Sequence, residues 1–154
     1  MAGYRNLPAE TAETLRDGWL HTGDIGALDA DGWLFIRDRK KDMAIVGGYN
    51  VYPREVDEVL HLHDGVLEAA AIGVPDDYRG EIIKAFVVAR PGWALERAEL
   101  LAHCARNLAK YKVPAVIEIV PNIPKTNVGK IDRKELRKMA VVNQGADRAA
   151  AERA

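Results

Sequence analysis

The sequence predicts an α+β fold: a two-layer α/β sandwich with a small mixed sheet, preceded by a β-hairpin. Two observations lead to this prediction. Short apolar runs of strand length alternate, over residues 41–141, with segments whose apolar residues recur at helical spacing. Residues 1–40 carry a hairpin pattern instead. Residues 142–154 show no sustained apolar face, so we expect a frayed tail there.

Composition sets the class of protein. Of 154 residues, 48% are hydrophobic and 29% are charged, which is typical of a folded globule. The formal charge of -1 gives no bulk attraction to nucleic acid or anionic lipid, so no nucleic-acid partner is expected. The single cysteine, and the lack of an apolar leader or of a run long enough to be a transmembrane segment, predict a cytoplasmic setting. Because the chain contains no serine, serine-nucleophile hydrolysis is excluded.

The first part of the chain is read as a hairpin. After a polar, turn-rich stretch to Asp17, residues 26–28 and 33–36 flank the turn signal Asp-Ala-Asp-Gly at 29–32. Two strands alone are marginally stable in water, because they have nothing to bury a face against. We therefore expect this hairpin to belong to something larger.

The second part contains the remaining regular elements. Pro53 suits the first turn of a helix, whose stripe is Val56, Val59 and Leu60. The sequence predicts, in order, a strand at 43–46, a helix from Pro53 to about 61–65, strands at 67–74 and 82–89, a helix at about 96–110 and a strand at 116–120. The last helix should begin at about Asp132, with Glu135 three residues on as in a capping box.

Lys130 is the first candidate for chemistry. It ends the loop 124–130 just before that helix, in a segment (125–138) with six basic and two acidic residues. A mobile ammonium beside Gly129 could neutralise a carboxylate or phosphate on another surface. A plain solvated lysine is the alternative. The loop is not a Walker P-loop, because it lacks the first glycine and no Ser or Thr follows the lysine.

Three other features have a functional and a purely structural interpretation. Asp24 could accept hydrogen bonds from a sugar diol or form an Asx turn. The run 39–41 (Arg-Lys-Lys) could hold phosphate or ribose oxygens or be a charged linker. Gly47 and Gly48 could let a ligand approach the backbone or simply end a strand.

Two further features favour structural roles. His61, His63 and Asp64 resemble a metal cluster, but imidazoles at a helix C-terminus more often meet the negative end of the dipole, so we expect no metal site. Cys104 has no His or Asp close by in the sequence. Packing in a core is the better explanation for it.

Four motifs in order resemble one family. They are Asp-Gly-Trp-Leu-His-Thr-Gly-Asp at 17–24, Asp-Arg-Lys-Lys-Asp-Met at 38–43, Gly-Gly-Tyr-Asn-Val-Tyr-Pro-Arg-Glu-Val at 47–56 and Pro-Lys-Thr-Asn-Val-Gly-Lys-Ile at 124–131. Together they are similar to the C-terminal portion of the acyl-CoA synthetases (fatty-acid-CoA ligases) of the adenylate-forming superfamily. The resemblance extends from Gly3 to about Met139.

The resemblance implies a two-step ligase. A carboxylic acid and Mg-ATP give an acyl-adenylate and pyrophosphate, and CoA then displaces AMP, so ATP/AMP, CoA and Mg²⁺ are implied for the full-length enzyme. By motif position, Lys130 would be the adenylation lysine, Asp24 and Arg39 would bind the ribose of the nucleotide, and Lys41 would be the hinge between half-reactions. The CoA tunnel would be lined by Gly47, Gly48 and Tyr49.

The same resemblance implies that a large N-terminal lobe is missing. Residues 1–40 would be its terminal strands and residues 41–141 the small C-terminal lobe, so the isolated chain is expected to be inactive and to bind no cofactor tightly. Residue 38 is Asp where many relatives have Gly. Two alternatives stay open: an aryl-CoA ligase or carrier-loading adenylation domain, and a non-catalytic module that binds CoA or a protein.

Overall fold

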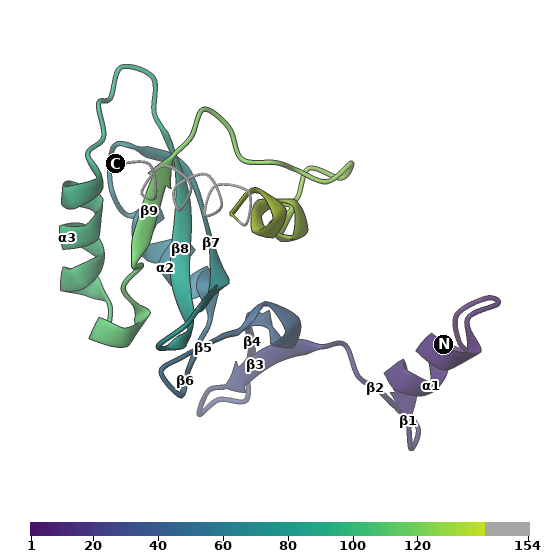
Figure 1. The fold of residues 1–154 in the computed structure, drawn as a ribbon. Helices are drawn as coiled ribbons and strands as arrows, with labels where there is room; N and C mark the ends of the chain where they lie inside the picture. The colour runs from purple at the N-terminus through teal and green to yellow at the C-terminus, as the bar shows by residue number, and fades with distance from the viewer. Residues whose placement is uncertain (141–154) are drawn as a thin grey trace. The chain divides into compact units, whose positions relative to one another are not determined.

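The computed structural model describes residues 1–140 of the chain. These form two compact units, Met1–Lys41 and a second that begins at Asp42 (Figure 1). None of the helices in the described part is both long enough and apolar enough to span a bilayer. The predicted frayed tail, 142–154, lies outside the described residues.

The first unit contains the predicted hairpin. Strands β3 (Asp24–Leu28) and β4 (Leu34–Arg39) pair antiparallel, with a bulge between Ile25 and Gly26. The Asp29 carboxylate shapes the turn, because its Oδ1 accepts the backbone N–H groups of Asp31 and Trp33 at 3.0 and 2.8 Å. The structure therefore confirms the turn that the sequence predicted, and it shows that the Asp29 side chain stabilises this turn.

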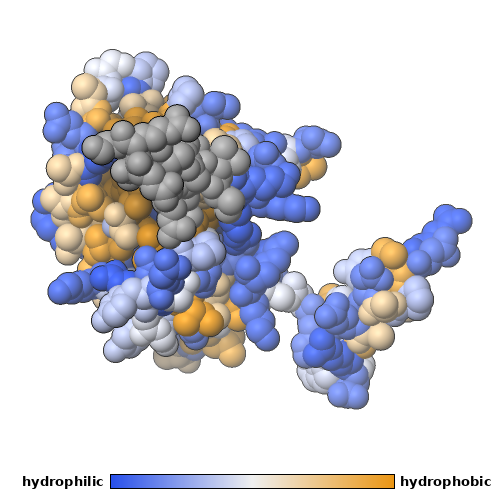
Figure 2. Space-filling view, in the orientation of Figure 1, coloured by the Kyte–Doolittle hydropathy of each residue, from blue (hydrophilic) through white to orange (hydrophobic). Residues whose placement is uncertain are grey.

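The stretch before the hairpin is more regular than predicted. It contains helix α1 (Pro8–Thr14) and a two-stranded ladder of β1 (Leu15–Arg16) and β2 (Trp19–Leu20). Helix α1 starts at a proline in its first turn but buries no residue, so it leaves no apolar stripe to read. Apolar side chains over these elements are open to solvent, as Figure 2 shows in orange.

The second unit is built on the predicted mixed sheet. Its order is β6-β5-β8-β7, and β9 pairs with β8 in parallel while the other pairs are antiparallel. The strands are β5 (Ala44–Val46), β6 (Tyr49–Val51), β7 (Val66–Asp76), β8 (Gly80–Ala89) and β9 (Val116–Ile119). Strand β6 was not predicted. Gly47 and Gly48 end β5 and also join it to β6, with φ of 56° and 85°, which is typical of a type I′ hairpin turn.

Helices cover both faces of this sheet. Helices α2 (Pro53–His61) and α3 (Arg97–Asn107) pack on one face, where Val56, Leu60, Leu100 and Cys104 join the first core cluster. The helix at 133–140 lies on the other face and contributes Leu136 and Ala140 to a second cluster (Figure 1). The predicted α/β class and mixed sheet are confirmed, and the structure adds a helix on the second face of the sheet.

The residues of the strands explain why both faces of the sheet are covered. Consecutive residues of β7 are buried on alternate sides, Ala69 and Ala71 in the first cluster and Ala70 and Ile72 in the second. A strand that is buried on both faces reads as a continuous apolar run, and such runs indicate cover on both sides. Residues 69–72 form such a run.

The last helix begins as predicted but with half of its capping box. The N–H of Glu135 donates to Asp132 Oδ1 at 3.1 Å, which confirms Asp132 as the N-cap. The reciprocal bond is not made. The Asp132 N–H donates to the Pro124 carbonyl at 2.9 Å, and the Glu135 carboxylate pairs with Lys138 at 2.7 Å.

Candidate functional site

Lys130 stands at the end of a hydrogen-bonded loop. The Thr126 N–H donates to the Lys130 carbonyl at 2.7 Å, and the Gly129 N–H donates to the Thr126 carbonyl at 2.8 Å. The Thr126 hydroxyl in turn accepts the Lys130 N–H at 3.2 Å, and Lys125 and Ile131 form a single antiparallel bridge below the turn. Gly129 has a φ of +77°, the left-handed region that glycine enters without strain. The backbone of this loop is therefore defined, whereas its tip is exposed.

Ion pairing separates Lys130 from four of its five basic neighbours, Lys134 being the exception. Four of the six cations in 125–138 have carboxylate partners: Lys125 with Glu68, Arg133 with Asp57, Arg137 with Asp42 and Lys138 with Glu135. The Lys130 side chain is exposed and has no ion-pair partner within residues 1–140. An unneutralised ammonium on a defined loop is available to an anion outside the described structure.

Asp24 and Arg39 are brought together in the first unit. They are register partners at the end of the β3–β4 ladder, and Arg39 Nε lies 3.3 Å from Asp24 Oδ1. The Thr22 hydroxyl accepts the Asp24 N–H at 3.1 Å, so the carboxylate itself does not form the Asx turn. Both side chains line an open hollow together with residues 13, 14, 16, 20–23 and 40–41. The pair therefore offers a hydrogen-bond acceptor and a cation side by side in a concave surface.

Lys41 and the Gly47–Gly48 turn are exposed parts of different units. Lys41 lies in the short 3-10 turn η1 (Lys40–Asp42) and is the last residue of the first unit. A Cβ added at Gly47 or Gly48 would meet nothing within 4 Å in the chain as described. Tyr49 follows the turn, 59% exposed, and its ring stacks on that of Tyr111 with a centroid distance of 4.6 Å.

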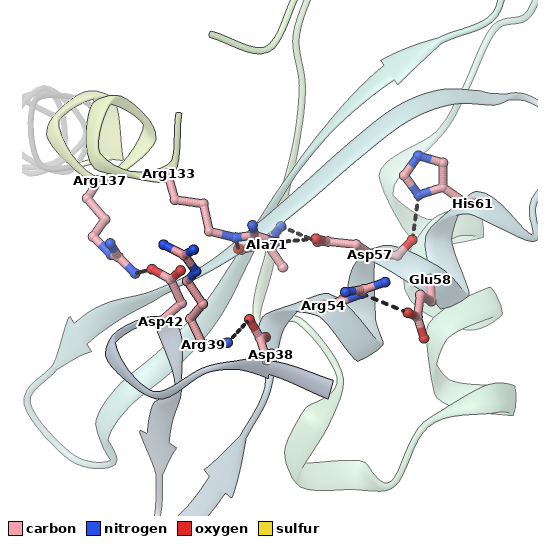
Figure 3. A network of polar contacts seen from close by, with 10 residues as sticks. All are labelled: Asp38, Arg39, Asp42, Arg54, Asp57, Glu58, His61, Ala71, Arg133 and Arg137. Atoms are coloured by element: carbon pink, nitrogen blue, oxygen red, sulfur yellow. Dashed lines mark hydrogen bonds and ion pairs between the residues drawn. The ribbon is translucent and has the colours of Figure 1, made fainter. Parts of the chain in front are cut away.

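Arg133 and Asp57 form a contact that the sequence did not predict (Figure 3). Asp57 is on α2 and only 7% exposed, and Arg133 Nη2 pairs with its Oδ2. The two side chains meet at the outer edge of β7, where the Ala71 N–H donates to Asp57 Oδ1 and Arg133 Nε donates to the Ala71 carbonyl. One turn later, Arg137 pairs with Asp42 at 2.8 Å. An acidic residue beside the apolar stripe of α2 was the only sequence signal for this contact.

The groups expected to have structural roles have structural partners. His61 Nδ1 lies 2.7 Å from the Asp57 carbonyl, one turn back in α2, and His63 Nε2 lies 3.2 Å from Glu99 Oε1. Across residues 1–140 no group of three His, Cys, Asp or Glu side chains is arranged to hold a metal ion. Cys104 is fully buried, and this burial raises the pKa of its thiol to about 11, so the reactive thiolate is disfavoured.

The fold of the second unit, with a mixed sheet, covering helices and an exposed lysine loop, defines a small α/β module. Residues 55–130 match the family model of the AMP-binding enzyme C-terminal domain. The four motifs had predicted this family.

The proteins that this chain is similar to include several ligases. The chain is 54% identical over 136 residues to a long-chain-fatty-acid--CoA ligase of Bacillus subtilis, covering 88% of this chain and 24% of the relative. It is 50% identical to the fatty acid--[acyl-carrier-protein] ligase ScoC of Streptomyces coeruleorubidus, covering 89% and 26%. The ATP-bound structure of MatB from Rhodopseudomonas palustris matches with a TM-score of 0.84 at 37% identity, covering 89% and 27%. The chain thus spans about a quarter of the length of the curated relatives it matches.

Proposed function

We propose that this chain acts as the C-terminal lobe of an AMP-forming ligase that activates a carboxylic acid, of the fatty-acid type, with ATP and transfers the acyl group to CoA. One observation carries the proposal. Lys130 is the cation that its loop presents to the outside, while four cations around it are neutralised within the chain. The family match and the fatty-acid-CoA ligase relatives support the reaction class.

The ammonium of Lys130 would act in the first half-reaction. There a carboxylate oxygen attacks the α-phosphorus of ATP and pyrophosphate leaves, so two anions must approach each other. A cation held at that point reduces their repulsion and stabilises the charge of the transition state. In the second half-reaction the CoA thiol attacks the acyl carbonyl and AMP leaves, and this step needs no lysine at the phosphate.

The other candidate residues serve the same scheme. Asp24 would accept hydrogen bonds from the ribose hydroxyls, with Arg39 beside it as a further donor. Lys41 would act as the hinge between half-reactions, and Gly47, Gly48 and Tyr49 would line the route of the CoA thiol. Mg²⁺ would accompany ATP. Since the relatives are about four times as long, we infer that this chain needs an N-terminal lobe for turnover. The cytoplasmic setting stays a prediction.

The test uses the chain joined to an N-terminal lobe and the substitution Lys130→Ala. We expect acyl-adenylate formation, followed as pyrophosphate exchange, to fall by about a hundredfold or more, as is usual when a transition-state charge loses its partner. Thioester formation from supplied acyl-adenylate should stay within about twofold of the parent. The matched control is Lys134→Ala, an exposed lysine four residues on, which should leave both half-reactions unchanged. Equal half-reactions in the Lys130→Ala and parent proteins would refute the assignment.

A second acceptor is supported by one relative. The similarity to the fatty acid--[acyl-carrier-protein] ligase keeps a carrier-bound thiol as an alternative to CoA. Offering free CoA and a phosphopantetheinylated carrier protein to the same adenylate-loaded enzyme separates the two. A clear preference for the carrier would replace CoA in the proposal and leave the role of Lys130 intact.

A further inference from the structure

We infer that Arg133 and Arg137 are positioning residues for Lys130, because they fasten the helix that follows the lysine loop to the body of the second unit. This inference rests on the proposed function only for its catalytic consequence. Its structural part concerns contacts within residues 42–140.

The Arg133 contact joins both faces of the sheet. Asp57 comes from α2, which packs on one face, and Arg133 comes from the helix 133–140, which packs on the other. They meet at the edge of β7, where Ala71 has both its N–H and its carbonyl directed away from β8 and bonded to these side chains (Figure 3). The guanidinium thus bonds a carboxylate and a backbone carbonyl at once, which suits its planar fork of donors.

The lysine loop is attached to this contact at close range. Asp132, the residue before Arg133, caps the helix and donates its N–H to the Pro124 carbonyl, which closes the base of the loop. On the other side of the loop, Lys125 pairs with Glu68 at 2.6 Å, so the loop is tied to β7 on both sides. Glu68 and Lys125 are more exposed than Asp57 and Arg133, and exposed pairs are weaker, so Arg133 should be the stronger tie.

Arg137 attaches the same helix to a second point of the unit, Asp42. Asp42, its partner, is the first residue of the second unit and follows the proposed hinge residue Lys41. The side chain of Asp42 is 11% exposed and that of Arg137 is 38% exposed. Arg133 and Arg137 are four residues apart, on one side of the helix. Lys130 is therefore fixed to the start of the second unit and would move with it as one body.

The first readout needs no catalysis. Order parameters of the backbone amides, from ¹⁵N relaxation of the full chain, should be near the rigid value of about 0.85 at Gly129 and Lys130 and drop toward about 0.6 in Arg133→Gln. Amides in the middle of β8 should not change. The control is Lys112→Gln, which breaks a pair with Glu55 of α2 at similar burial, 21% exposed against 20% for Arg133, away from the loop.

The second readout uses the chain joined to an N-terminal lobe. Arg133→Gln should lower adenylation at saturating ATP by about tenfold or more with KM for ATP within twofold, because loss of orientation acts on the chemical step. Thioester formation from supplied acyl-adenylate should be unchanged, and Arg133→Lys should restore part of the adenylation rate. If Arg133→Gln does not fold, Arg137→Gln, at a more exposed position, is measured by the same criteria.

Each outcome of these two experiments supports or overturns one part of the inference. Unchanged order parameters at Gly129 and Lys130 would overturn the positioning contact whatever the enzyme does. A mobile loop with a normal adenylation rate would overturn its catalytic consequence, and equal losses in both half-reactions would mean a purely structural role. Failure of the proposed function is recognised separately, since Lys130→Ala would then leave adenylation intact while the order parameters still report on the loop.

Discussion

At the scale of single residues, ionic partnership distinguishes the candidate catalytic lysine from four of the five other cations in 125–138, and Lys134 is the fifth. Lys125 and Lys130 frame the same loop and are both lysines near a turn. Lys125 is paired with Glu68, whereas Lys130 has no such partner among residues 1–140. A surface ion pair contributes little to stability. It does occupy the charge of the cation, so the ion pairs show which cations remain available to bind an external anion.

Gly48 allows a residue-level test of the proposed CoA route. In the chain joined to an N-terminal lobe, Gly48→Ala should slow thioester formation from acyl-adenylate by about tenfold, because a methyl group would narrow a close passage for the thiol. Adenylation should stay within about twofold. Gly92→Ala is the matched control, because Gly92 has a φ of +83° against +85° for Gly48 and equally open surroundings. Similar thioester rates in the two variants would remove Gly48 from the CoA route.

Cys104 predicts a pH dependence of stability. Its folded pKa of about 11 lies above the ordinary value of 9.0, so the unfolded chain loses the thiol proton first as pH rises. The contribution of Cys104 to the free energy of unfolding has its full value below pH 9. It is lost between pH 9 and about 11, because in this range the thiol is protonated in the folded chain but not in the unfolded chain. At pH 10.5 the free energy of unfolding should have lost about 2 kcal/mol from this group, relative to pH 8.

Denaturant titrations of the parent and of Cys104→Ala at pH 8 and pH 10.5 measure this loss. The difference in unfolding free energy between the two proteins should shrink by about 2 kcal/mol at the higher pH. Tyrosines and lysines titrate in both proteins and largely cancel in the comparison. A difference that does not depend on pH would mean that the thiol is not protected by burial.

At the scale of elements, the sequence predicted those features that depend only on residues close together in the chain. The turn at 29–32, the start of α2 at Pro53 and the N-cap Asp132 were all read from residues that bond or constrain their own backbone. Strand β6 and the cover on both sheet faces depend on distant partners. Around α3, Ala98, Leu101, Ala105 and Leu108 recur at helical spacing in the sequence. Leu101 and Leu108 are partly buried against the first cluster, whereas Ala98 and Ala105 are exposed, and Leu100 and Cys104 are the fully buried residues.

The candidate site divides in the same way. Lys130, Asp24 and Arg39 could be singled out from motifs, and the structure adds the geometry of the Asp24–Arg39 pair. The Arg133–Asp57 contact could not be predicted, because 76 residues separate the two and an acidic residue beside the apolar stripe of α2 does not identify its partner. Two helices on opposite faces of a sheet meet only once the sheet edge between them exists.

The half-formed capping box gives an element-scale prediction. Asp132→Ala should lower the free energy of unfolding by about 1 kcal/mol, because the Glu135 N–H then loses its acceptor at the helix start. Glu135→Ala should change it by less than about 0.5 kcal/mol, since the carboxylate pairs only with Lys138, whose side chain is 63% exposed. Thermal and denaturant unfolding measure both variants. Equal losses would indicate a complete capping box in solution.

At the scale of the whole molecule, burial is concentrated in one unit. Both core clusters lie between residues 44 and 140, and within 1–41 no apolar side chain is buried. Large apolar residues of the hairpin are exposed instead, such as Trp33 at 70% and Leu34 at 64%. Large exposed apolar side chains on neighbouring residues often mark a surface that contacts another part of a protein. The assignment of residues 1–40 to a larger lobe stays a prediction.

Removing the first unit therefore predicts a specific result. A chain that starts at Asp42 should keep the midpoint of thermal unfolding within a few degrees, because no buried apolar contact of either cluster is lost. Binding of the dye ANS should fall, since exposed apolar surface is removed. Leu136→Ala in the same shortened chain is the positive control and should cost about 2–5 kcal/mol, because Leu136 is fully buried. A large drop in the midpoint on removal of residues 1–41, comparable to that of Leu136→Ala, would show that the first unit supports the core of the second.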